Sequence, residues 1–117
     1  MTSDPIGLFE GFSEVGDREF YEKVISAEKP SVVLFVEPGN PANREVAELL
    51  EGFVEEYGDR VNFFLVDVSR NMCHEDFGVF SFPALIYFRE SMELDRHDFV
   101  PTRELVEEAI RRILRLT

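Results

Sequence analysis

Residues 31–57 read SVVLFVEPGNPANREVAELLEGFVEEY. The first six, Ser31–Val36, form an apolar run rich in β-branched residues, which is typical of a central strand covered on both faces of a sheet. Residues 37–41 contain two prolines and a glycine, and they predict a turn. From there to Tyr57 the apolar residues recur at helical spacing, so an amphipathic helix is expected to follow.

Both ends of this helix are marked in the sequence. Asn40 can accept hydrogen bonds from the free amides of the first turn, and Pro41 suits the first helical position. At the other end, Gly58 and Asp59 interrupt the apolar pattern. The quoted stretch therefore predicts a strand, a tight turn and a well-capped helix in direct succession.

The segments on either side alternate between strand and helix patterns. Ahead lie a short candidate strand, Leu8–Phe12, and a helix, Asp17–Ala27, with Asp17 as its N-cap. The order β-α-β-α-β-(α)-β-β-α predicts one α/β domain over residues 1–117, with a central mixed sheet of four to five strands flanked by helices. Beyond the quoted stretch we expect a buried strand at Val61–Val68, a short helical or irregular crossover at Asn71–Phe77, strands at Ala84–Phe88 and Met92–Phe99 joined by a turn at Glu90-Ser91, and a last helix capped by Thr102.

The chain is strongly acidic. It carries 24 acidic and 12 basic side chains, a net charge of −12, and 44% of its 117 residues are hydrophobic. This balance argues against a nucleic-acid partner, because phosphate binding needs a basic surface. No apolar run is long enough to cross a membrane and no leader pattern opens the chain, so we expect no membrane insertion. The charge has two interpretations: it keeps the domain soluble, or it attracts a basic segment of a partner.

The one cysteine, Cys73, excludes an intramolecular disulfide and fits a reducing, cytoplasmic location. The neighbouring His74 can lower the pKa of this thiol, which leaves a monothiol or redox-sensing role open beside that of a partly buried bystander. His74 and His97 stand far apart without a second cysteine, so the sequence offers no zinc spacing. We therefore expect no metal and no other cofactor.

The order of elements and two stretches of sequence resemble the thioredoxins. Residues 33–57 are similar, without a gap, to the strand, active-site turn and helix of that family. Residues 77–84, FGVFSFPA, are similar to the segment that carries the family's cis-proline. The resemblance implies a thioredoxin-like fold and a cis Phe82–Pro83 bond, since X–Pro is the peptide bond that tolerates the cis isomer. The alternative is that Pro83 merely begins a strand.

The resemblance also shows what is missing. Thioredoxins carry Cys-Gly-Pro-Cys at the helix start, because a helix N-terminus lowers the pKa of a cysteine and supplies a thiolate. The gapless match places Asn40-Pro41-Ala42-Asn43 there, with Gly39 in place of the family's preceding aromatic residue. It places Leu34 and Leu65 where the family buries an Asp and a Lys that assist proton transfer. No dithiol–disulfide oxidoreductase activity is therefore expected, and no residue is assigned a catalytic role.

What the resemblance leaves is a groove for another protein. In the family, the backbone beside the cis-proline pairs with an extended substrate segment, so a binding module, a chaperone or an adaptor, is expected. Each of the turn residues also has a simpler role as an ordinary turn former. The candidate partner-binding residues are Pro38, Gly39, Asn40, Pro41, Ala42, Asn43, Ser81, Phe82, Pro83, Phe99 and Val100.

Within this class, residues 38–41 and 77–84 are similar to the cysteine-free thioredoxin-like proteins of uptake-hydrogenase maturation. That similarity implies a chaperone for a hydrogenase small subunit and its twin-arginine signal peptide. An acidic domain suits such a basic signal segment, because charge complementarity speeds encounter and selects partners. Two alternatives stay open: a structural subunit of a larger assembly, and a monothiol redox protein acting through Cys73.

Overall fold

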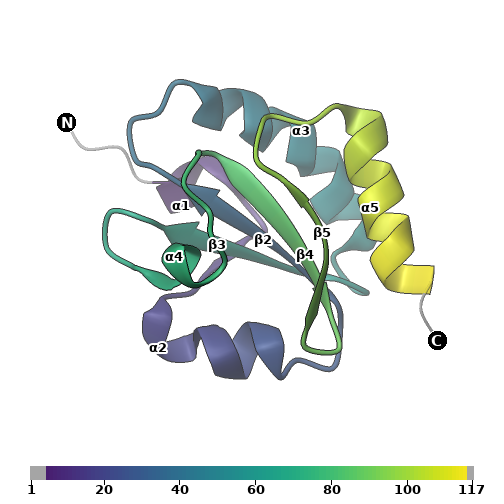
Figure 1. Ribbon diagram of the computed structural model, residues 1–117. Coiled ribbons are helices and arrows are strands. Elements are labelled where there is room, and N and C mark those ends of the chain that lie inside the picture. Colours follow the sequence, from purple (N-terminus) through teal and green to yellow (C-terminus); the bar gives the residue numbers. More distant parts are fainter. Residues whose placement is uncertain (1–4, 116–117) are drawn as a thin grey trace.

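The computed structural model describes residues 5–115, which form a five-stranded mixed sheet between two layers of helices (Figure 1). The strand order is β1-β3-β2-β4-β5, with β1, β3 and β2 parallel and β4 and β5 antiparallel to their neighbours. The predicted α/β fold with a mixed central sheet is confirmed. The elements are α1 (Pro5–Leu8), β1 (Ser13–Glu14), α2 (Asp17–Phe20), η1 (Tyr21–Ile25, a turn of π-helix), β2 (Ser31–Val36), α3 (Ala42–Tyr57), β3 (Asn62–Asp67), α4 (Cys73–Asp76), β4 (Ala84–Arg89), β5 (Met92–His97) and α5 (Arg103–Arg115).

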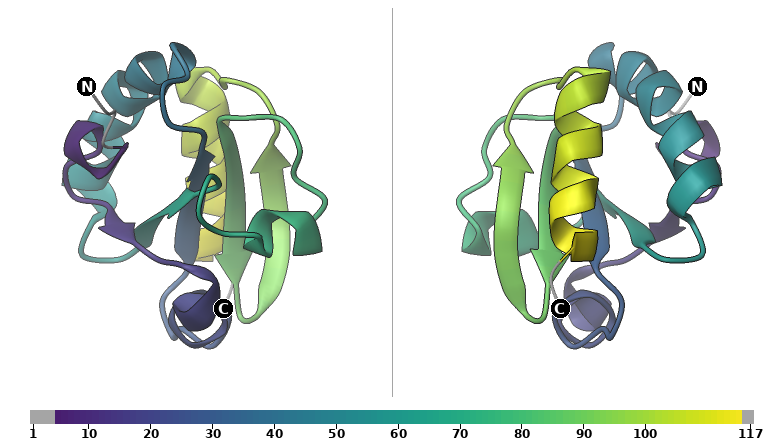
Figure 2. Two further views of the ribbon diagram at one scale, coloured as in Figure 1. Left: turned by 90° about the vertical axis from the view of Figure 1, so that its left-hand side faces the viewer. Right: turned by 90° about the vertical axis from the view of Figure 1, so that its right-hand side faces the viewer.

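Strand β2 explains why helices cover both faces of the sheet. All six of its residues are buried, and successive side chains point to opposite faces. Leu34 belongs to the core beneath α3 and α5, whereas Phe35 belongs to the core beneath α2, η1 and α4. The two side views show these helical layers on opposite sides of the sheet (Figure 2). Burying a side chain of this size contributes about 1.5–3 kcal/mol to folding, so the central strand anchors both layers.

The predicted first strand, Leu8–Phe12, is wrong. Leu8 ends helix α1, and the strand comes later, at Ser13–Glu14, where it pairs with Phe64 and Leu65 of β3. The reason is the spacing of two aromatic residues, Phe9 and Phe12. They lie three positions apart across a turn closed by the Phe12 N–H and the Phe9 carbonyl (3.2 Å), and both rings enter the core below α3. A strand would have turned them to opposite faces.

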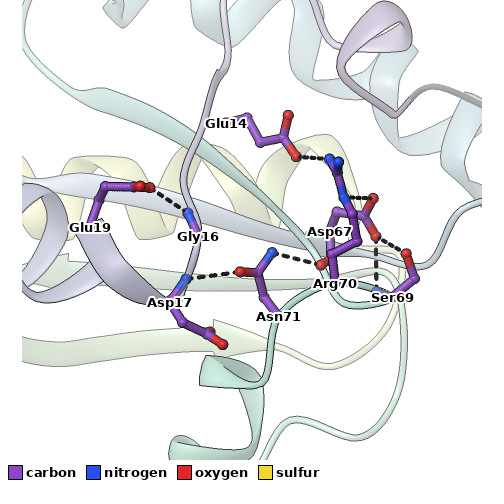
Figure 3. Close-up of polar contacts among 8 residues, drawn as sticks. All are labelled: Glu14, Gly16, Asp17, Glu19, Asp67, Ser69, Arg70 and Asn71. Atoms are coloured by element: carbon purple, nitrogen blue, oxygen red, sulfur yellow. Dashed lines mark hydrogen bonds and ion pairs between the residues drawn. The ribbon is translucent and has the colours of Figure 1, made fainter.

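The predicted N-cap of the second helix is also wrong. Gly16 is the N-cap of α2, and its amide donates to Glu19 Oε1 at 2.8 Å (Figure 3). The amide of Asp17 donates to Asn71 Oδ1 at 2.9 Å, while its carboxylate accepts the Cys73 amide at 2.7 Å. Asp17 therefore caps α4, an element 56 residues away in the chain, and the helix expected over Asp17–Ala27 divides into α2 and η1.

The other predicted boundaries agree with the structure to within one or two residues. Thr102 Oγ1 accepts the Leu105 amide at 3.2 Å and caps α5, as expected. The hairpin turn at Glu90-Ser91 has φ of 52° and 69°, the left-handed values that two-residue hairpins favour. Within residues 5–115 none of the helices combines the length and the apolar character that a membrane crossing requires.

Candidate functional site

Three loops meet at one edge of the sheet and, with the first two residues of α3, carry the predicted partner-binding residues. Phe35 lies opposite Ala84, and Leu85 lies opposite His97, so the end of β2, the start of β4 and the end of β5 share this edge. The loops are residues 37–41 before α3, the residues before β4, and residues 98–102 between β5 and α5, all at the top of Figure 1. The sheet register, rather than sequence proximity, brings the predicted residues to one end of the molecule.

Asn40 joins the first two loops. Its Oδ1 accepts the Ala42 amide at 2.9 Å, which confirms the predicted cap of α3. Pro41, with a helical φ of −63°, stands at the N-cap position, one residue before the place predicted for it. The Nδ2 of Asn40 donates to the carbonyl oxygen of Phe82 at 3.2 Å, and the Phe82–Pro83 bond is cis as expected. The contact with Phe82 was not predicted, because it spans 42 residues of sequence.

Asn43 is buried at the second of the two family cysteine positions. Only 3% of the residue is exposed, and its Nδ2 donates to the Glu37 carbonyl at 2.9 Å. That carbonyl can only accept, so the donor fixes which end of the amide faces it. Asn43 Oδ1 then has no hydrogen-bond partner among the residues that the structure describes. Asn43 shapes the turn from below and presents no surface to a partner.

The remaining predicted residues differ in exposure. Ser81, Gly39 and Pro41 are exposed, while Pro83 is buried. Phe99 is 55% exposed, and its ring lies 5.6 Å from that of His97. Pro38, Ala42, Phe82 and Val100 are half-buried.

Phe80, in the loop before β4, belongs to the same edge, but it was not among the residues predicted from the sequence. It is 71% exposed and stands two residues before Phe82. A large apolar residue in the loop ahead of the proline was the available signal. Together with Phe99, it gives the site exposed aromatic surface beside its polar Asn40 link.

Two leucines replace the buried charges of the thioredoxin pattern. Leu34 and Leu65 are register partners on the adjacent strands β2 and β3, and both are fully buried. Their pairing agrees with the gapless match of the sequence. An Asp and a Lys at these positions would lie side by side in the core, whereas two leucines can neither hold nor move a proton.

Cys73 lies outside the candidate site, and its thiol is a poor nucleophile because it is protonated at neutral pH. It is buried in α4, and this burial, with the neighbouring Asp17 carboxylate, raises the pKa of Cys73 to about 12. The expectation that His74 lowers this pKa is therefore not met. The His74 ring instead packs edge-on against Phe82, 5.4 Å between centroids. Within residues 5–115 no three His, Cys, Asp or Glu side chains are grouped to hold a metal ion.

Comparison with known proteins agrees with this geometry. The family model described as Thioredoxin matches residues 11–112. Thioredoxin X, chloroplastic, of Arabidopsis thaliana is 27% identical over 85 residues, which are 72% of this chain and 47% of that protein. The chain thus spans about half the length of the curated relative it matches. With the matched range extending from before β1 into α5, the chain belongs to the thioredoxin family.

Proposed function

We propose that this domain is a non-redox protein-binding module, a chaperone or adaptor that holds an extended segment of another protein. The observation that carries the proposal is the use of Asn40 and Asn43. Both occupy family cysteine positions, and their amides form hydrogen bonds that organise the turn and the Phe82 loop. An amide cannot attack or carry a disulfide, so the edge keeps its shape without the chemistry.

The chemistry of the edge suits a segment with apolar and basic side chains. Phe80 and Phe99 supply exposed aromatic surface, which gives contact area at low entropic cost. The exposed Glu37 and Asp98 belong to the first and third of the loops that form the edge. With the net charge of −12, they favour a basic partner and speed its encounter.

The Phe82 carbonyl remains able to pair with such a segment. It already accepts one hydrogen bond, from Asn40, so one of its two lone pairs remains for a backbone amide of the partner. Strand pairing at this carbonyl and side-chain contacts with the aromatic surface are therefore compatible, and we propose that both contribute to binding.

The finer proposal names the partner as a hydrogenase small subunit and its twin-arginine signal peptide, bound in the cytoplasm. Its support is the similarity of residues 38–41 and 77–84 to the hydrogenase-maturation proteins, together with the acidic charge. A monothiol role for Cys73 is disfavoured, because the thiol stays protonated at neutral pH.

A binding experiment with a defined peptide tests both levels of the proposal. A fluorescent twin-arginine signal peptide is titrated with the full chain at low and high salt, with and without reductant. We expect saturable binding that weakens in salt and is indifferent to reductant. Phe80→Ser with Phe99→Ser should weaken it about tenfold, whereas Met92→Ser, at the equally exposed far hairpin, should not.

The controls separate the two levels. A peptide with both arginines replaced by glutamine tests the signal, and a basic extended peptide of unrelated sequence tests the module. Equal binding of the unrelated peptide would remove the hydrogenase assignment and keep the module. Binding that is unaffected by the Phe80 and Phe99 substitutions, or abolished by Cys73→Ser, would overturn the proposal.

A further inference from the structure

A hollow lies between η1 and α4 on the sheet face opposite α3 and α5. It is lined chiefly by the apolar side chains of Tyr21 and Ile25 in η1 and of Met72 and Phe77, which flank α4. Figure 1 shows the two elements that border it, the helix at the bottom that continues from α2 and the short helix α4 above it. None of the residues of the candidate site lines it, so it is a separate surface.

Two exposed side chains make this hollow unusual. Tyr21 is 72% exposed and Met72 is 60% exposed, although both are large and largely apolar. Exposed apolar groups that gather in one concave place mark interaction surfaces more often than single scattered ones do. Tyrosine supplies rigid contact area, and methionine adapts its shape to a partner.

The backbone holds both residues in place. The Ser26 amide donates to the Tyr21 carbonyl at 2.9 Å and closes a turn of π-helix, a rare conformation that is frequent at functional sites. The Met72 amide donates to the Asp17 carboxylate at 2.9 Å. The two exposed side chains therefore project from fixed backbone, which lowers the entropic cost of binding.

The charged side chains that line the hollow have one sign. Asp17, Glu75 and Asp76 line it, and among the residues the structure describes no Lys, Arg or His side chain does. A partner that places apolar groups in the hollow and basic groups on its rim satisfies both features. An amphipathic helix does this, since its apolar residues lie on one face and its Lys and Arg residues flank them.

We propose that the hollow between η1 and α4 is a docking site for a basic amphipathic helix of a partner protein. The apolar face of that helix covers Tyr21 and Met72, and its basic residues meet Glu75 and Asp76. The site is independent of the extended segment proposed for the edge at Phe82, so one partner can engage the domain at two places.

The test uses the full chain, labelled with ¹⁵N, and a designed peptide of leucine and lysine in helical amphipathic order. A scrambled peptide of the same composition and a leucine–glutamate peptide are the comparisons. We expect amide shifts that concentrate on Tyr21, Ile25, Met72 and Phe77 with the first peptide alone. Tyr21→Ser with Met72→Ser should weaken binding about tenfold, and Glu75→Gln with Asp76→Asn should weaken it and flatten its salt dependence.

Met92→Ser is the matched control, because Met92 is 59% exposed on the β4–β5 hairpin, away from the hollow. It should bind like the unaltered chain. Equal binding of the scrambled peptide would reduce the interaction to net charge and overturn the proposal. Shifts confined to the Phe80–Pro83 loop, or full affinity in the Tyr21 and Met72 variant, would also overturn it. Because both side chains are exposed, their substitution should leave the fold intact, and thermal melts of each variant check this.

Discussion

Replacing Asn40 with alanine tests whether this one side chain holds the candidate site together. Asn40 caps α3 through Oδ1, at 2.9 Å from the Ala42 amide, and links α3 to the Phe82 carbonyl through Nδ2, at 3.2 Å. Loss of an N-cap costs about 1 kcal/mol, and loss of a hydrogen bond to a partly buried carbonyl costs about as much again. The free energy of unfolding should therefore fall by about 2 kcal/mol.

Urea denaturation followed by circular dichroism measures this change, with the slope of the transition expected to stay constant. Asn40→Ser is the matched control, because serine is a good N-cap but its hydroxyl is too short to bridge to Phe82. It should lose about half as much, roughly 1 kcal/mol. A loss below about 0.5 kcal/mol in the alanine variant, or equal losses in both variants, would refute the assignment of two separate contributions.

Three further predictions follow from buried groups. Burial lowers the pKa of His97 below its usual 6.5, so as the pH falls the unfolded chain binds a proton before the folded chain does. The stability that neutral His97 contributes should be complete above about pH 6.5 and should be lost as the pH drops below it. Urea denaturation at several pH values should show that the free energy of unfolding depends less on pH in His97→Gln than in the unaltered chain. The thiol of Cys73, with its pKa raised to about 12 mainly by burial, should react with a thiol reagent at neutral pH only as fast as the chain unfolds, and rapid labelling of the folded protein would contradict this. Leu34→Asp should cost about 3–5 kcal/mol by leaving a charge unpaired in the core, and adding Leu65→Lys should recover part of it, since the two residues are register partners; no recovery in denaturation midpoints would show that they do not meet.

The sequence predicted those parts of the fold that rest on local patterns. The apolar, β-branched composition of Ser31–Val36 predicts a buried strand. The helical spacing of apolar residues and the N-terminal cap predict the helix that ends at Tyr57. The first strand was misplaced because Phe9 and Phe12 enter the core from a turn, where the direction of the chain and not the alternation of residues decides burial.

The site was predicted in outline and not in its contacts. The resemblance to thioredoxins located the turn and the cis-proline, and the cap of α3 by Asn40 followed from its position alone. The bond from Asn40 to Phe82 and the capping of α4 by Asp17 join residues 42 and 56 positions apart, so their geometry comes only from the packed sheet. No local rule contains such a contact.

The proposed non-redox role gives the changes at Asn40, Asn43, Leu34 and Leu65 a single common explanation. Burying an Asp and a Lys destabilises the fold through desolvation, and in a redox protein the pair is retained because it assists proton transfer. Where no thiols are present, the pair would destabilise the fold without serving a function. Leu34 and Leu65 remove that cost and fill the core. Stability alone, however, does not account for the outer surface of the same edge, because the exposed rings of Phe80 and Phe99 add little to folding and expose apolar area to water. The proposed partner would cover those rings, so their substitution is the sharpest test of the binding proposal.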